Sequence, residues 1–235
     1  MAGKLYLIPS SLGDHPTGVM PNDAINIVHG LKVFIAERAK TARRFLKTLK
    51  TPVPFPEMEI YELNKHTPEQ EINAFLDKAI HENTDIGLLS EAGCPGVADP
   101  GARIVMMAHQ NNIQVMPLIG PSSILLALMA SGMNGQQFAF KGYLPIKTPE
   151  RVKALKSLEN LAQRFNQTQI FIETPYRNNG LVQDALKSLS NDTLFCIAAD
   201  LTQPSQYVST KQVGQWKKNG PPDLNKRPAV FLIYR

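Results

Sequence analysis

Cysteine is scarce in this sequence, and its scarcity limits the kinds of structure that we expect. Two cysteines occur in 235 residues, Cys94 and Cys196, and neither belongs to a C-x-x-C pair. A disulfide framework needs more cysteines, and a structural zinc site needs closely spaced ligands. We therefore expect neither, and a reducing, cytoplasmic location is the natural one for this composition.

Long apolar runs and several common catalytic motifs are also missing. No run approaches the roughly 18 apolar residues that span a bilayer, so we expect no membrane partner. The absence of any G-x-G excludes the dinucleotide fingerprint and the glycine-rich loop of the common Rossmann-type methyltransferases. The P-loop pattern and the G-x-S-x-G turn of hydrolases are absent too. The five histidines are scattered without ligand spacing, so we expect no metal.

The composition that remains is that of an ordinary globular protein. Apolar residues make up 43% and charged residues 19% of the chain, which is long enough for one large α/β domain or two small ones. The formal net charge of +5 is mild. Such a charge is compatible with RNA or another anionic partner, although many proteins without one are equally basic.

Short apolar runs alternate with helical patterns through the first half of the chain. The runs are nearly continuous, which is typical of parallel strands covered on both faces. Asn22 and Asp23 are expected to cap the first helix, and the proline-rich segment TPVPFPEMEIY is expected to be an extended connection. This half therefore predicts a doubly wound α/β unit. Its expected strands span residues 4–9, 32–37, 84–90 and 113–119, and its expected helices span 22–31, 39–49, 67–80 and 102–112.

The second half has consecutive strands with fewer helices between them, which predicts a mixed sheet. Trp216, the single tryptophan, is expected to anchor the last helix. We place the boundary within residues 116–121, giving an N-terminal α/β domain of residues 1–117 and a C-terminal α/β domain of residues 118–235. The expected strands span residues 137–144, 168–174, 193–201, 206–212 and 229–235, and the expected helices span 121–132, 148–165, 177–190 and 213–219.

Three loops rich in glycine, proline and serine follow predicted strands. They are PSSLGD at Pro9–Asp14, SEAGCPGVADPG at Ser90–Gly101 and GPSS at Gly120–Ser123. In open α/β folds, ligands bind at the carboxyl ends of the strands, where these loops lie. Glycine lets the backbone approach a ligand, and proline fixes a loop before binding. One such loop is also typical of a plain turn, and GPSS alone is a good helix N-cap, but three on one edge favour a binding site.

SEAGCPGVADPG resembles the Ser-Asp-Ala-Gly-Thr-Pro…Ser-Asp-Pro-Gly segment of the tetrapyrrole methylase superfamily. The similarity is collinear over nearly the whole chain, because LYLIPSSLGD, FIAERAKTARRFL, GPSSILLALMASGM, FAFKGYLP and FIETPYR also have counterparts in that family. The chain is most similar to the branch that methylates a ribose 2′-hydroxyl in small-subunit ribosomal RNA. The resemblance implies two α/β domains, with S-adenosylmethionine bound in the cleft between them, and a homodimer.

The resemblance also implies site residues. The reaction would be methyl transfer from a sulfonium to a hydroxyl, which a nearby base would assist. Glu37 and Glu91 could each act as that base, or could instead anchor their loops. The cofactor contacts, most of them backbone contacts in the family, correspond to Pro9, Gly93, Cys94, Val97, Ser122, Ser123, Thr174, Ala199 and Pro228.

The acceptor side is where the sequence departs from the family. The family's Asp, Thr and Arg after Glu37 are replaced by Arg38, Ala39 and Lys40, and its Arg-Glu-Leu-Thr-Lys segment is replaced by ADLTQ at residues 199–203. The chain also ends before the C-terminal extension that is usual in the ribosomal enzymes. The cofactor loops are largely retained, so the resemblance supports the assignment of the cofactor better than the assignment of the methyl acceptor.

Basic residues could contact the phosphates of an RNA acceptor, although they are equally typical of a solvated helix face. The candidates are Lys40, Arg43, Arg44 and Arg177. Two other functions stay open. The chain could methylate a small molecule such as a tetrapyrrole, or it could be a non-catalytic module that binds the cofactor or RNA.

Overall fold

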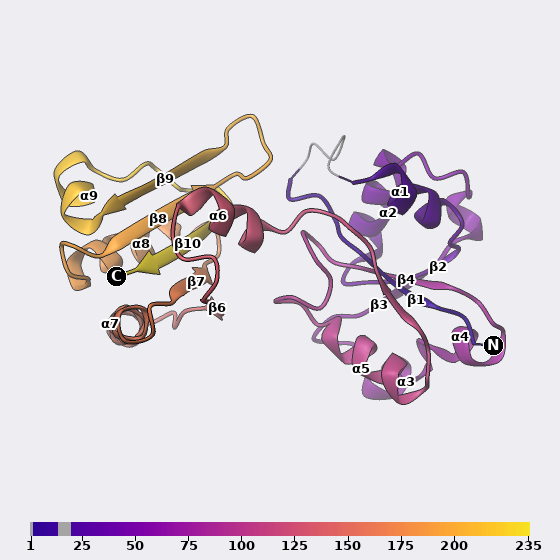
Figure 1. Ribbon diagram of the computed structural model, residues 1–235. Helices are drawn as coiled ribbons and strands as arrows, with labels where there is room; N and C mark the ends of the chain where they lie inside the picture. The colour runs from indigo at the N-terminus through magenta and orange to yellow at the C-terminus, as the bar shows by residue number, and fades with distance from the viewer. Residues whose placement is uncertain (1, 14–19) are drawn as a thin grey trace. The chain divides into compact units, whose positions relative to one another are not determined.

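The computed structural model describes residues 2–13 and 20–235, which form two compact units (Figure 1). The chain divides between Ser122 and Ser123. The sequence places the boundary after residue 117, so residues 118–122 belong here to the first unit.

The first unit is built on a five-stranded parallel sheet. Its strands are β1 (Leu5–Ile8), β2 (Val33–Ala36), β3 (Glu59–Glu62), β4 (Ile86–Leu89) and β5 (Val115–Pro117). They lie in the order β3-β2-β4-β1-β5, and every neighbouring pair is parallel. β2 and β4 are buried along their whole length, as their unbroken apolar runs predict.

Helices cover both faces of this sheet, and each face has its own apolar core. Helices α1 (Asn22–His29) and α2 (Ala39–Thr48) pack on one face. Helices α3 (Glu69–Ala74), α4 (Asp77–His81) and α5 (Ala102–Gln110) pack on the other, as Figure 1 shows. The doubly wound arrangement expected from the sequence is therefore confirmed.

Three local expectations in this unit are wrong. Asn22 and Asp23 do not cap α1, because Pro21 occupies the N-cap position and no side chain bonds to the first turn. The segment expected to be only an extended connection holds a 3-10 turn, η1 (Phe55–Glu57), and the edge strand β3. An edge strand needs bonds on one side only, so the nearby prolines do not prevent it. The single helix expected over residues 67–80 is two helices, because the chain turns between α3 and α4.

The second unit is built on a five-stranded mixed sheet, as its sequence predicts. Its strands are β6 (Phe138–Tyr143), β7 (Thr168–Ile172), β8 (Leu194–Ala199), β9 (Tyr207–Gln212) and β10 (Ala229–Tyr234). They lie in the order β6-β7-β10-β8-β9. The β6–β7 pair is parallel, and the other three pairs are antiparallel.

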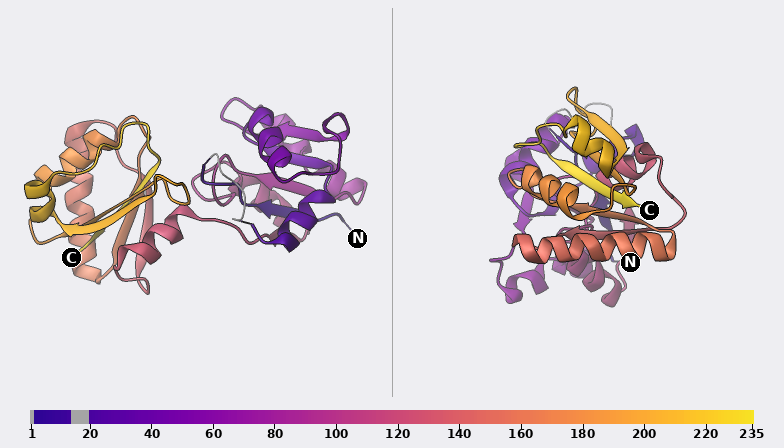
Figure 2. Two further views of the ribbon diagram at one scale, coloured as in Figure 1. Left: turned by 90° about the horizontal axis from the view of Figure 1, so that it is seen from above. Right: turned by 90° about the vertical axis from the view of Figure 1, so that its left-hand side faces the viewer.

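One apolar core joins this sheet to α7 (Thr148–Phe165), α8 (Asn178–Ser188) and α9 (Val213–Asn219). Trp216 of α9 is fully buried, and its indole N–H donates to the carbonyl of Phe195 at 2.8 Å. It therefore anchors α9, as expected. Helix α6 (Ser123–Ser131) packs on the opposite face of the sheet (Figure 2).

Candidate functional site

The loops that follow β1 and β4 are hydrogen-bonded to each other. The Ser10 amide donates to the Gly93 carbonyl at 2.9 Å, and the Gly93 amide donates to the Ser10 carbonyl at 3.0 Å. The Ser10 hydroxyl donates to the carbonyl of Ser90 at 2.7 Å, and the Ser90 hydroxyl donates to that of Gly93 at 2.6 Å. Both serines are buried, so these bonds fix the path of the β4 loop.

The loop after β5 joins the same cluster. Gly120 lies so close to Pro9 that a Cβ at Gly120 would come within 2.5 Å of the proline ring. The Cys94 thiol donates to the carbonyl of Pro121 at 3.6 Å. Partial burial raises the pKa of this thiol, and a hydrogen bond with Ser122 opposes the increase. The three loops predicted from the sequence therefore form one cluster at the carboxyl edge of the sheet.

The sequence-predicted cofactor residues of the first unit all belong to this cluster. They are Pro9, Gly93, Cys94, Val97 and Ser122. Val97 is 46% exposed, so its side chain is accessible to a ligand. Asp99 supports the loop around it by accepting bonds from the amides of Gly96 at 2.7 Å and Gly101 at 2.8 Å. Asp14, the last residue of the β1 loop, lies outside the described residues.

The candidate bases Glu37 and Glu91 follow β2 and β4 at this edge. Partial burial raises the pKa of Glu37, and the negative charges of Glu91 and Asp99 raise it further, while Arg38 opposes the increase. Glu91 is exposed, and it accepts a 2.5 Å hydrogen bond from the hydroxyl of Thr41 in the first turn of α2. This bond gives Glu91 an anchoring contact. A role as base stays a prediction for both residues.

Helix α2 begins within the segment that departs from the family pattern. The Glu62 carboxylate accepts a 2.7 Å bond from the Ala39 amide and so caps the helix from the end of β3. Lys40, Arg43 and Arg44 are exposed on this helix. A hollow of about 200 Å³ lies between α2 and the loops after β1 and β4. Its lining includes Ser10–Gly13, Thr41, Arg44, Phe45, Thr48 and Ser90–Ala92.

Three predicted residues of the second unit, Thr174, Ala199 and Pro228, lie at one edge of its sheet. Ala199 ends β8 and pairs with Ala229, the first residue of β10. The Asp200 amide donates to the carbonyl of Pro228 at 2.9 Å. Thr174 follows β7, whose last residue pairs with β10 near its start. Ser123 is not part of this edge group, because it begins α6.

Sequence reasoning missed the acidic partner of Arg177. The Arg177 guanidinium donates to the Glu173 carboxylate at 2.6 Å, and the Glu173 side chain is fully buried. Burial alone would raise the pKa of Glu173, but the bonds from Arg177 and from the Thr174 amide lower it overall. The helical i,i+4 rule does not apply to this loop before α8, so the sequence gives no local signal for the pair.

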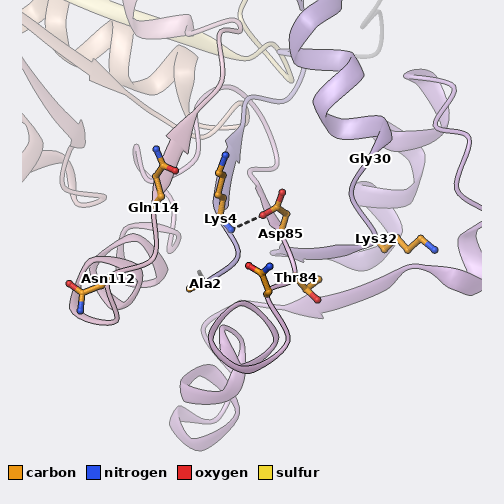
Figure 3. Close-up of a pocket in the computed structure, with 9 residues that line it drawn as sticks. Ala2, Lys4, Gly30, Lys32, Thr84, Asp85, Asn112 and Gln114 are labelled. Atoms are coloured by element: carbon orange, nitrogen blue, oxygen red, sulfur yellow. Dashed lines mark hydrogen bonds between the residues drawn. The ribbon is translucent and has the colours of Figure 1, made fainter.

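A larger hollow, of about 780 Å³, lies at the opposite edge of the first sheet (Figure 3). The Lys4 amide donates to the Asp85 carboxylate there at 2.7 Å, and the side chains of Lys32 and Asn112 point outward. None of the sequence-predicted site residues lines it. Because ligands of open parallel sheets bind at the carboxyl ends of strands, the loop cluster is the better candidate.

Residues 2–13 and 20–235 hold no group of three or more His, Cys, Asp or Glu side chains placed to bind a metal. No helix in that part of the chain is long and apolar enough to cross a membrane.

Comparison with known proteins gives the family. The family model of the tetrapyrrole (corrin/porphyrin) methylases matches residues 4–216. "Ribosomal RNA small subunit methyltransferase I" of Escherichia coli O157:H7 is 27% identical over 234 residues, which cover 98% of this chain and 77% of the relative. The Vibrio cholerae protein of the same name is 28% identical over 204 residues, which cover 87% of this chain and 67% of the relative.

A solved structure gives the same fold. The uroporphyrin-III C-methyltransferase of Thermus thermophilus, complexed with S-adenosylhomocysteine, aligns with a TM-score of 0.58 at 15% identity, over 99% of this chain and 98% of that one. At this identity the likeness concerns the fold alone. The family model covers most of the sequence, so the chain belongs to the tetrapyrrole methylase family.

Proposed function

We propose that this chain is an S-adenosylmethionine-dependent methyltransferase that modifies a ribose 2′-hydroxyl of small-subunit ribosomal RNA. The observation that carries the proposal is the cluster of three loops held together by the Ser10–Gly93 bridge. The names of the curated relatives support the RNA acceptor. The S-adenosylhomocysteine of the Thermus structure supports the cofactor.

The loop cluster fits a cofactor that is recognised mainly by backbone groups. Gly93 has φ of +73°, and a Cβ there would lie 3.4 Å from Leu12 and 3.8 Å from the carbonyl of Pro121. The glycine thus keeps the centre of the cluster free of side-chain atoms. Bound S-adenosylmethionine supplies an electrophilic methyl group on its sulfonium. The proposed contacts are Pro9, Gly93, Cys94, Val97 and Ser122 in the first unit, and Ser123, Thr174, Ala199 and Pro228 in the second.

Glu37 is the better candidate for the base that accepts the hydroxyl proton. Its pKa is raised by burial and by two neighbouring carboxylates, so it binds a proton more readily than an ordinary glutamate. Glu91 is already bonded to Thr41 and would hold α2 against the β4 loop. Most of the remaining acceleration would come from positioning the two reactants, because the sulfonium is reactive by itself.

The exposed cations of α2 suit an RNA acceptor. Lys40, Arg43 and Arg44 can neutralise phosphates, which would make RNA binding weaken steeply as salt rises. A ribosomal acceptor also agrees with the cytoplasmic location that the low cysteine content predicts. The homodimer implied by the family resemblance stays a prediction, which light scattering of the purified protein tests directly.

Methyl transfer to ribosomes tests the proposal. Purified protein and methyl-labelled S-adenosylmethionine are incubated with small ribosomal subunits from a strain that lacks this protein, and the label is mapped. We expect label on a ribose. Transfer to a porphyrinoid but not to RNA would contradict the acceptor, and cofactor binding without any transfer would favour a non-catalytic module. No binding of S-adenosylmethionine in calorimetry would contradict the central claim.

A further inference from the structure

Two tyrosines are unusually exposed where β6 and β7 end. Tyr143, the last residue of β6, is 57% exposed, and Tyr176, four residues after β7, is 76% exposed. Because β6 and β7 are parallel, their carboxyl ends share one edge of the sheet. Tyrosine has an apolar ring and a polar hydroxyl and is enriched at interfaces, so two exposed tyrosines at one edge of the sheet favour a binding surface.

A β-bulge sets the direction of Tyr143. Phe140 pairs with Ile170, but Tyr143 rather than Gly142 pairs with Ile172, so β6 carries one extra residue. Gly142 has φ of +67° and open space around it, so the glycine serves the backbone conformation and not close packing. Since side chains alternate along a strand, the extra residue moves Tyr143 to the position that Gly142 would otherwise occupy.

Arg177 is fixed beside these tyrosines by its bond to the buried carboxylate of Glu173. That bond is the largest cause of the raised pKa of Arg177, and Tyr143 is near enough to contribute. Three buried side-chain atoms here have no hydrogen-bond partner: Glu173 Oε2, Arg177 Nε and Asn178 Oδ1. A ligand cannot reach these buried atoms directly, but the Arg177 side chain is 36% exposed and can present its other N–H groups to an anion.

The charges around this edge are mostly positive. The Lys226 amide donates to the carbonyl of Pro175 at 3.2 Å, which places Lys226 next to Tyr176, and Lys141 is exposed on β6. The carboxylate of Asp200 is bonded to Arg227 at 2.7 Å, and that of Glu173 is bonded to Arg177. The Asp223 carboxylate nearby accepts a bond from the Asn179 side chain at 2.7 Å, so the two lysines leave a small excess of positive charge, which favours an anionic partner.

We propose that Tyr143, Tyr176 and Arg177 form a platform that holds one single-stranded nucleotide step of the RNA acceptor. The tyrosine rings stack on bases, and the guanidinium contacts the phosphate between them, which is how proteins grip single-stranded RNA without reading its sequence. The platform rests on the proposed RNA acceptor. It adds an RNA-binding surface built from residues of the second unit alone.

Replacement of each tyrosine by alanine and by phenylalanine tests the platform. The affinity for a short fluorescein-labelled single-stranded RNA is measured by anisotropy, and KM and kcat are measured on small ribosomal subunits. We expect Tyr143→Ala and Tyr176→Ala each to weaken RNA binding about tenfold, since a stacked base is worth roughly 1–3 kcal/mol. KM should rise more than kcat falls, and the phenylalanine variants should stay near the wild type because they keep the ring.

The matched control is Phe138→Ala, which removes a 41% exposed aromatic ring from the opposite end of β6. Unchanged affinity for S-adenosylmethionine shows that each variant is folded. If the tyrosine variants bound RNA as tightly as Phe138→Ala does, the platform would be wrong. The proposed methyltransferase function would not be affected by that result. Loss of subunit binding with unchanged affinity for free RNA would point to a protein partner and also overturn it. Failure of the wild type to methylate any RNA would instead contradict the proposed function.

Discussion

Gly93, a proposed cofactor contact, has a backbone conformation that few other residues adopt. Its φ of +73° is one that a β-branched residue adopts only with strain, and its Cβ direction points toward Leu12 and Pro121. We expect Gly93→Val to weaken S-adenosylmethionine binding at least tenfold and to lower the free energy of unfolding by about 1–3 kcal/mol. Calorimetry and urea denaturation measure the two effects.

The control for this change is Gly135→Val, because Gly135 has open space around it and lies in an exposed turn. It should leave cofactor affinity unchanged. If Gly93→Val bound the cofactor as tightly as the wild type, the β4 loop would be an ordinary turn.

The proposed role of Glu37 as base predicts a pH dependence of the reaction. Its folded pKa is raised above the ordinary 4.5, so methyl transfer should fall with decreasing pH at a higher pH than a free glutamate would cause. The same shift costs stability, because the unfolded chain ionises more easily. The free energy of unfolding should therefore decrease as pH rises from about 4.5 through the folded pKa.

Glu37→Gln should remove this limb of the pH–rate profile, reduce kcat about 100-fold or more, and keep cofactor affinity. Glu91→Gln should reduce kcat far less, since an amide oxygen can still accept the hydrogen bond from Thr41. A Glu37→Gln enzyme with a normal rate and profile would remove Glu37 from the list of bases.

At the scale of elements, a buried ion pair ties α7 to α8. The Arg151 guanidinium donates to the Asp184 carboxylate at 2.8 and 2.5 Å and to the carbonyl of Ile146 at 2.9 Å. The side chains are only 7% and 13% exposed. Asp184→Ala would strand a buried cation, so we expect a loss of about 3 kcal/mol in the free energy of unfolding.

Urea denaturation measures this loss, and Glu150→Ala is the control. Glu150 pairs with Lys147 at 3.9 Å on the surface, where both side chains are more than half exposed. Its removal should change stability by less than about 0.5 kcal/mol. If both substitutions lowered the free energy of unfolding equally, burial of the Arg151–Asp184 pair would not make it more important for stability than a surface pair.

Elements with strong local signals were predictable from the sequence. The bounds of α7 follow from its Thr-Pro-Glu start and its apolar periodicity, and the observed helix spans the expected residues 148–165. Strand β3 was missed because its residues are partly exposed and its flanks contain prolines. The break between α3 and α4 was missed because burial of both Phe75 and Leu76 depends on tertiary packing.

In the candidate site, too, the features with a local sequence signal were predictable and the others were not. Glycine and proline density marks the loops after β1, β4 and β5, because backbone conformation is a local property. No local signal marks the contact of Gly120 with Pro9, or the burial of Glu173, since each depends on segments that are distant in sequence or on the packing around a strand end. Sequence therefore predicts which loops are special, and the fold determines what they contact.

At the scale of the whole molecule, ligand binding should stabilise the chain by mass action. S-adenosylhomocysteine at about 100 times its Kd should add about 2.7 kcal/mol, provided that only the folded state binds it. For a chain of 235 residues this raises Tm by roughly 5–11 °C. Differential scanning calorimetry measures the shift. ATP, which shares the adenosine but lacks the amino-acid part, should shift Tm much less. At the same ligand concentration, Gly93→Val should reduce the Tm shift caused by S-adenosylhomocysteine by about half or more. An equal shift with both ligands would mean that the chain recognises adenosine alone, which a methyl-donor site built from three loops does not predict.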